Sequence, residues 1–170
     1  MSESNGDEQP GTSQALIQEA PATSTEEALR ESHAARARSA YDRSTAACRY
    51  AGVGEDQARL VPIGPASRAA NAVRLSSEGI AAFAESAPDP AADARRARNA
   101  AAAAVLAAQV AQSHGAGELS DAAYHSALKA SLAAGVAAGR EGMGRSEALN
   151  AEADAAEAAA VAGAKTAGWM

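Results

Sequence analysis

Large apolar side chains are scarce in this sequence. Leucine, isoleucine, valine and phenylalanine together supply 20 of the 170 residues, whereas alanine alone supplies 52. Aromatic residues make up only 3% of the chain. These numbers exclude a core built mainly from large side chains, and a buried methyl group contributes little free energy of folding because its area is small. The chain must therefore pack its elements very closely or take part of its core from a second molecule.

Other shortages exclude several classes of protein. The single cysteine, Cys48, excludes an internal disulfide and suits a reducing compartment, so we expect a cytoplasmic protein. The longest apolar run falls short of the roughly 20 residues that a membrane-spanning helix needs. The N-terminal residues 1–10 lack the basic and apolar regions of a signal peptide. A net charge of −6 argues against nucleic acid as a partner, since that usually requires a basic domain.

Helix-forming residues are what the chain has in abundance, because alanine has the highest helix propensity. We expect residues 1–22, rich in serine, glutamate, glutamine, proline and threonine, to form a disordered acidic tail. We expect residues 23–170 to form one all-α domain, an up-and-down antiparallel bundle of about five alanine-rich helices. The alanine and arginine usage also suggests a GC-rich, bacterial coding sequence.

Capping and breaking residues divide the domain into its helices. Ser24 and Glu27 have capping-box spacing, and Pro88-Asp89-Pro90 separates the second helix from the third. The connections are short, as an antiparallel bundle requires. The expected helices cover residues 24–50, 65–87, 89–114 and 120–139, with a fifth from residue 146 onward.

Apolar periodicity predicts the face that each helix buries. Four arginines lie off the stripe expected for residues 24–50: Arg36, Arg38, Arg43 and Arg49. The polar face of the last helix carries Glu147, Asn150, Asp154 and Glu157. The stripe expected for residues 24–50 is Ala34, Ala37, Tyr41, Ser44 and Cys48. The stripe expected for residues 120–139 is Tyr124, Leu128, Leu132, Gly135 or Val136, and Gly139. Gly135 and Gly139 favour tight packing within the molecule. The connecting residues Leu60, Val61 and Ile63 are expected to plug one end of the bundle.

Few residues suggest chemistry. The sequence holds no phosphate loop, dinucleotide fingerprint or nucleophile elbow. Cys48 is interpreted as a small buried hydrophobe, Asp121 and His125 as a pair at a helix start rather than metal ligands, and His33 as a solvated surface residue. The basic cluster Arg95–Arg98 favours pairing with acidic neighbours over binding of an external anion. We therefore expect no catalytic, cofactor-binding or metal-binding residues.

The leading functional hypothesis is a non-enzymatic helical interaction, scaffold or assembly protein, such as an immunity-type protein or inhibitor, with a protein partner or self-association. A second hypothesis is a bundle that binds a small apolar ligand between its helices. The side chains expected to line that site are Tyr41, Phe83, Tyr124 and Trp169. A weaker third hypothesis is an enzyme that uses Cys48 or His125. Trp169, near the end of the sequence, is expected to fold back onto the bundle.

Overall fold

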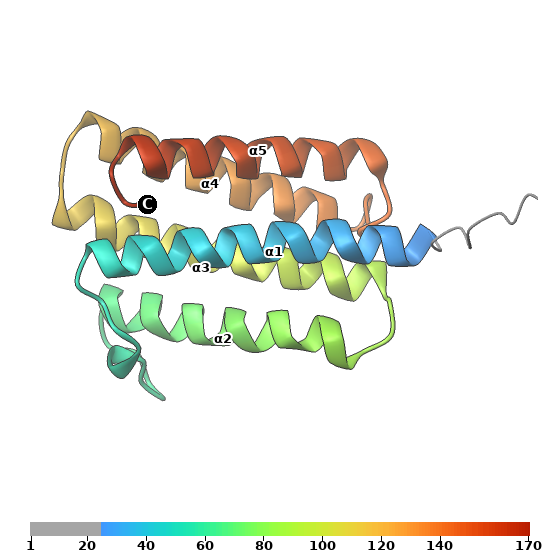
Figure 1. Cartoon of the computed structure of the whole chain (residues 1–170), viewed down its shortest axis with the longest axis horizontal. Coiled ribbons are helices and arrows are strands. Elements are labelled where there is room, and N and C mark those ends of the chain that lie inside the picture. Colours follow the sequence, from blue (N-terminus) through green and yellow to red (C-terminus); the bar gives the residue numbers. More distant parts are fainter. Residues whose placement is uncertain (1–24) are drawn as a thin grey trace, which may run out of the picture.

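A computed structural model describes residues 25–170, which form an all-α bundle and contain no strand. Successive helices run in opposite directions, so the expected up-and-down antiparallel topology is confirmed (Figure 1). The expectations for residues 1–22 and for Ser24 lie outside the described residues. The elements are α1 (Thr25–Tyr50), the short 3₁₀ helix η1 (Glu55–Gln57), α2 (Pro65–Glu85), α3 (Pro90–His114), α4 (Glu118–Ala138) and α5 (Glu147–Thr166).

The helices lie in three layers (Figure 1). α2 forms one outer layer, α1 and α3 form the middle, and α4 and α5 form the other outer layer. α3 is the central helix because it packs against α1, α2 and α4. α1 and α5 run in the same direction and lie beside each other, so the first and last helices of the described chain are neighbours in adjacent layers.

Local sequence sets the bounds of α3. The side chain of Asp89 accepts hydrogen bonds from the amides of Ala91 and Ala92, both at 3.1 Å, and Pro90 occupies the first turn, where its missing amide costs nothing. Gly115 follows the last turn. Between these ends the inward positions are almost all alanine. The α3 alanines that are at most 3% exposed are Ala94, Ala97, Ala100, Ala101, Ala103, Ala104, Ala107, Ala108 and Ala111.

α4 presents the opposite face from the one its leucines predict. Leu132 and Val136 are 70% and 53% exposed. The residues buried on α4 are Ser120, Ala123, Ala127, Ala130, Ala134 and Ala137. The predicted stripe was therefore wrong for Leu132 and Val136, because the spaces along α4 accept methyl groups and leave these larger side chains outside. Tyr124, at the start of the stripe, is partly buried against the core. Tight packing of Gly135 within the molecule is also wrong, since a methyl group added there would meet nothing within 4 Å. α4 begins at Glu118 rather than Ser120.

The C-terminal residues close one end of the bundle. Trp169 is 5% exposed and belongs to the core cluster that also holds Cys48, so its expected return onto the bundle is confirmed. Its backbone amide donates to the carbonyl of Ala164 at 2.9 Å. The ring centroids of Trp169 and Tyr50 are 6.4 Å apart, which links the end of α1 to the end of the chain.

Candidate interaction surfaces

The connection between α1 and α2 exposes three large aliphatic side chains. Leu60, Val61 and Ile63 are 101%, 72% and 88% exposed, and we refer to them as the apolar tip. The expectation that they plug the end of the bundle is wrong. Val53 is the aliphatic residue of this connection that packs against the core, and Trp169 fills the same cluster.

Contacts at both ends of the connection hold the tip in this position. Gly52 has a φ of 68°, a left-handed conformation that favours glycine, and turns the chain away from α1. The amide of Val53 then donates to the carbonyl of Cys48 at 2.8 Å. At the other end, the hydroxyl of Ser67 in α2 accepts from the amide of Ile63 at 3.0 Å. The tip therefore lies between two anchored stretches of backbone.

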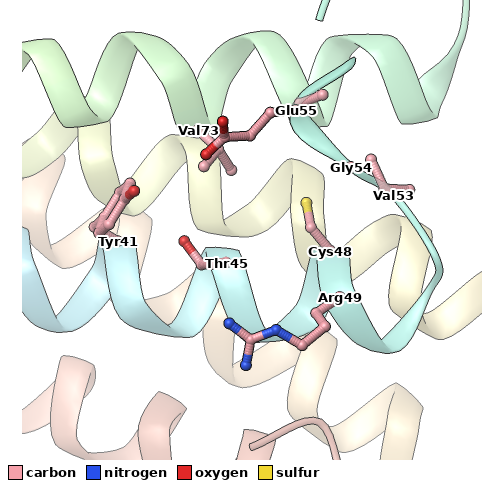
Figure 2. Close-up of a pocket in the computed structure, with 9 residues that line it drawn as sticks. Tyr41, Thr45, Cys48, Arg49, Val53, Gly54, Glu55 and Val73 are labelled. Carbon is pink, nitrogen blue, oxygen red and sulfur yellow. The ribbon is translucent and has the colours of Figure 1, made fainter. Parts of the chain in front are cut away.

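The start of the same connection forms one wall of a crevice of about 220 Å³ between α1 and α2. Figure 2 shows Tyr41, Thr45 and Cys48 extending from α1 toward Val73 on α2. Arg49 and Glu55 are the charged residues that line the crevice, and the guanidinium of Arg49 points away from Val73, whereas Glu55 lies at the mouth. The crevice is lined by Tyr41, Thr45, Cys48, Arg49, Val53, Gly54, Glu55, Ala70 and Val73.

The polar groups inside the crevice are not arranged for catalysis. Burial raises the pKa of the Cys48 thiol to about 11, so the thiol is protonated at neutral pH. The thiolate is the nucleophilic form, and no histidine lines the crevice to generate it. The hydroxyl of Thr45 is buried and has no hydrogen-bond partner among the described residues. The geometry agrees with Cys48 as a small buried hydrophobe.

Charged and polar side chains connect α1 with α5, and we refer to this contact as the α1–α5 seam. The guanidinium of Arg43 donates to the two carboxylate oxygens of Glu157 at 3.2 and 2.8 Å. Arg36 donates from Nε to Asp154 at 2.7 Å. Arg36, Arg43 and Glu157 are only 2 to 4% exposed, so the expectation that they lie off the buried surface was wrong. Asp154 on the same face of α5 is exposed, as expected. The seam consists of His33, Arg36, Ser39, Arg43, Asn150, Asp154 and Glu157.

His33 is fully buried at one end of the seam, which corrects its interpretation as a surface residue. Its Nε2 donates to the carbonyl of Gly144 at 2.9 Å. Burial lowers the pKa of His33, and the positive charge of Arg36 adds to that effect. Gly144 has a φ of 73°, and a Cβ there would lie 2.1 Å from the carbonyl oxygen of Pro90. The turn before α5 therefore fits against α1 and α3 only because residue 144 is glycine.

The basic cluster Arg95–Arg98 is used partly within the molecule. Arg96 donates to the buried carboxylate of Asp93 at 2.6 Å, and Arg30 from α1 donates to both oxygens of the same carboxylate at 2.9 and 3.0 Å. Burial opposes ionisation of Asp93, but these hydrogen bonds and charges outweigh it and lower its pKa. Arg98 bonds to the neighbouring Asn99, and Arg95 is exposed. Pairing with an acidic neighbour is thus confirmed for Arg96.

The pair Asp121 and His125 lies near the start of α4, as expected, without converging on a common ligand. The ring Nδ1 of His125 donates to the backbone carbonyl of Asp121 at 2.7 Å. The carboxylate of Asp121 accepts from Gln112 of α3 at 2.7 Å. Within residues 25–170, no three histidine, cysteine, aspartate or glutamate side chains are grouped closely enough to hold a metal ion.

The four aromatic residues expected to line a ligand site do not share one cavity. Tyr41 lines the crevice, while Tyr124 and Trp169 pack against the core cluster around Cys48. Phe83 belongs to a different core cluster and lies under the guanidinium of Arg96, 5.6 Å from its ring centroid. Only Tyr41 remains available to a molecule in the crevice.

Comparison of the chain with models of protein families, with curated proteins and with solved structures gives no match. Among the described helices, none combines the length and the apolar character that crossing a membrane would require.

Proposed function

We propose that the protein is a non-enzymatic helical interaction or assembly protein, and that the apolar tip is its main contact surface. The observation that supports this most strongly is the exposure of Leu60, Val61 and Ile63 together. In a chain this short of large side chains, the three contribute nothing to the folded monomer. Burying each of them against a partner would contribute about 1.5–3 kcal/mol to the stability of the complex.

Two further observations support the same proposal. α4 directs Leu132 and Val136 outward, which provides a second apolar surface. The Cys48 thiol and His33 are buried, and the ionic groups of the seam are paired with each other, so reactive groups are not collected at an open site. Our proposal places the protein in the cytoplasm, because Cys48 is a free thiol, and does not include a nucleic-acid partner, because the net charge is −6.

The experiment compares the wild type with a variant that has serine at all three tip positions. We expect the wild type to self-associate in sedimentation velocity or to retain a protein partner in a pull-down, and the tip variant to lose that association. The matched control is Leu132→Ser, which removes an exposed leucine from α4 and should retain the association made through the tip. Circular dichroism confirms that all three proteins are folded. A wild type that is monomeric and binds no partner would contradict the proposal.

A second candidate function is the binding of a small apolar ligand, which the crevice supports. Its volume of about 220 Å³ exceeds the roughly 150 Å³ of a protein cavity known to hold benzene. The predicted ligand is a small, largely apolar molecule in contact with Tyr41 and Val73. Calorimetric titration with p-cresol would test this, with a Thr45→Phe variant as the filled-crevice control. Equal heats from both proteins would rule out binding in the crevice.

A further inference from the structure

We infer that the partner of the apolar tip is a second copy of this chain, with Leu60 of each molecule seated in the crevice of the other. The inference rests on the proposed function, because it names the partner of the surface proposed there. Three features of the connection between α1 and α2 support it: the fit of Leu60 to the crevice, the opposite charges of Arg59 and Glu55, and the position of tip and crevice at the same end of the two helices.

The first feature is the fit between the tip and the crevice. Leu60 is completely exposed, and the crevice offers about 220 Å³ between Tyr41 and Val73. That volume exceeds the roughly 150 Å³ in which a cavity of a protein holds benzene, so it accommodates a leucine side chain and part of a neighbour. Val61 and Ile63 would then cover the rim. A side chain that fills a well-packed pocket, with surrounding contacts that exclude water, has the arrangement found at binding hot spots.

The second feature is charge. Arg59 directly precedes the tip, is exposed, and makes no ion pair with any residue from 25 to 170. Glu55 lies at the mouth of the crevice and is likewise unpaired within that range. When Leu60 enters the crevice of another molecule, Arg59 arrives beside that molecule's Glu55. The charges are therefore complementary in the same arrangement that the apolar groups favour.

The third feature is symmetry. The residues of the crevice wall, Val53 to Glu55, and the tip belong to one connection, at the same end of α1 and α2. A two-fold axis that places one tip in the crevice of the other molecule also places the second tip in the first crevice. Both contacts form at once, so the dimer is closed and leaves neither tip exposed.

Sedimentation equilibrium of the full chain, measured up to about 1 mM, tests the inference. We expect a monomer–dimer equilibrium in the wild type. Leu60→Asp should raise the dissociation constant at least about tenfold, because it places an unpaired carboxylate in an apolar pocket at both contacts. Leu132→Ser is the control, with an unchanged constant. A wild type that remains monomeric throughout overturns the inference, and a partner still captured through the tip would leave the proposed function standing.

Exchanging the charges of Glu55 and Arg59 tests whether these two residues meet across the dimer contact. Both side chains are exposed, so the substitutions should leave the fold unchanged. Glu55→Arg and Arg59→Glu should each weaken the dimer by up to about thirtyfold, because one exposed ion pair, worth up to about fivefold, is lost at each of the two contacts. The double variant should recover wild-type affinity, because the two charges again oppose each other between molecules. A dimer that responds to neither single substitution, or a double variant weaker than both, would contradict the arrangement.

Mixing two defective variants tests reciprocity. Leu60→Asp has an intact crevice, and Thr45→Phe has an intact tip but a filled crevice. Neither should form the closed dimer alone, whereas their mixture should form heterodimers through the one remaining intact pair. If Thr45→Phe is not folded by circular dichroism, Ala70→Met fills the same crevice from α2. No association in the mixture of folded variants would overturn the reciprocal contact.

Discussion

α1 forms two very different contacts on its two sides. Toward α3 it presents Ala34, Ala37 and Ala40, all at most 3% exposed, within an apolar cluster. Toward α5 it presents Arg36 and Arg43, whose guanidinium groups reach carboxylates of α5. Both contacts are buried, but one is filled by methyl groups and the other by long charged side chains.

The difference shows two ways to build an interior from a chain with few leucines. Alanine lets two backbones approach, so the α1–α3 contact is extensive without large side chains. The α1–α5 contact is sparser, and the aliphatic stems of the arginines fill the wider space between the helices. That solution carries a cost, because each buried guanidinium must be neutralised by a carboxylate at short distance. The two contacts should therefore respond to opposite kinds of substitution.

The largest expected effect comes from removing one charge of the seam. Glu157→Gln keeps the shape of the side chain but leaves the cation of Arg43 without its counter-charge in a buried position. Breaking a buried ion pair in this way costs about 3–5 kcal/mol. Urea unfolding followed by circular dichroism measures the change in the free energy of unfolding.

The control for that substitution is the exposed pair between Arg74 and Glu78 on α2. Glu78→Gln should change the free energy of unfolding by no more than about 1 kcal/mol, since surface ion pairs contribute little. Equal losses from Glu157→Gln and Glu78→Gln would contradict the conclusion that the seam depends on buried charge.

The alanine contact should be sensitive to added volume instead. Ala37 is fully buried on α1, and Ala37→Leu would force α1 and α3 apart. Overpacking of this kind costs about 1–3 kcal/mol. Ala35 lies two residues away on the exposed face of the same helix, and Ala35→Leu should remain within about 0.5 kcal/mol of the wild type. A stabilised Ala37→Leu protein in the same unfolding assay would show that the contact is loosely packed.

The helices could be predicted from the sequence because their ends carry specific local signals. Asp89 and Pro90 marked the start of α3 and Gly115 its end, and these act within a single turn of helix. The buried faces could not be predicted in the same way. Alanine and leucine are both apolar, so a periodic pattern of apolar residues does not distinguish them. The leucines of α4 were therefore expected to be buried, whereas its buried residues are mainly alanines. Which of the two is buried depends on the distance between helices, which a single helix does not encode.

The seam left a partial signal in the sequence. Arg36 and Arg43 are seven residues apart, as are Asn150 and Glu157, and this spacing of about two turns places each pair on one face of its helix. The sequence could not show that α1 and α5 are neighbours, however. The apolar tip gave no usable signal, because three aliphatic residues in a connection normally predict burial.

A smaller effect should follow from the buried histidine of the seam. The pKa of His33 is lowered by burial, so the unfolded chain binds a proton more readily than the folded protein. The contribution of His33 to stability is therefore fully present above its ordinary pKa of 6.5 and declines as the pH falls below it. Urea unfolding midpoints at a series of pH values from about 7.5 down to 5 would show this decline.

His33→Gln is the matched variant for the pH series. A glutamine amide can still donate to the carbonyl of Gly144 but does not titrate, so the decline below pH 6.5 should be flattened. The pKa of Asp93 is also lowered, so the contribution of Asp93 to stability is likewise lost as the pH falls. That loss occurs around and below the ordinary aspartate pKa of 3.8 and therefore outside this pH series. The same slope in both proteins between pH 6.5 and 5 would mean that His33 is not responsible.

The smallest expected effect is on the outer face of α4, where Leu132 and Val136 are exposed and the alanines on the other side of the helix are buried. Leu132 is 70% exposed, so Leu132→Ala removes a side chain that the folded monomer hardly buries. Alanine also has the higher helix propensity, and the free energy of unfolding should stay within about 0.5 kcal/mol of the wild type. A loss well above about 1 kcal/mol that grows with protein concentration would show that another molecule covers this face, since only an association that stabilises the folded state makes unfolding depend on concentration. A loss independent of concentration would instead place Leu132 inside the bundle, and the outward orientation of α4 would be wrong.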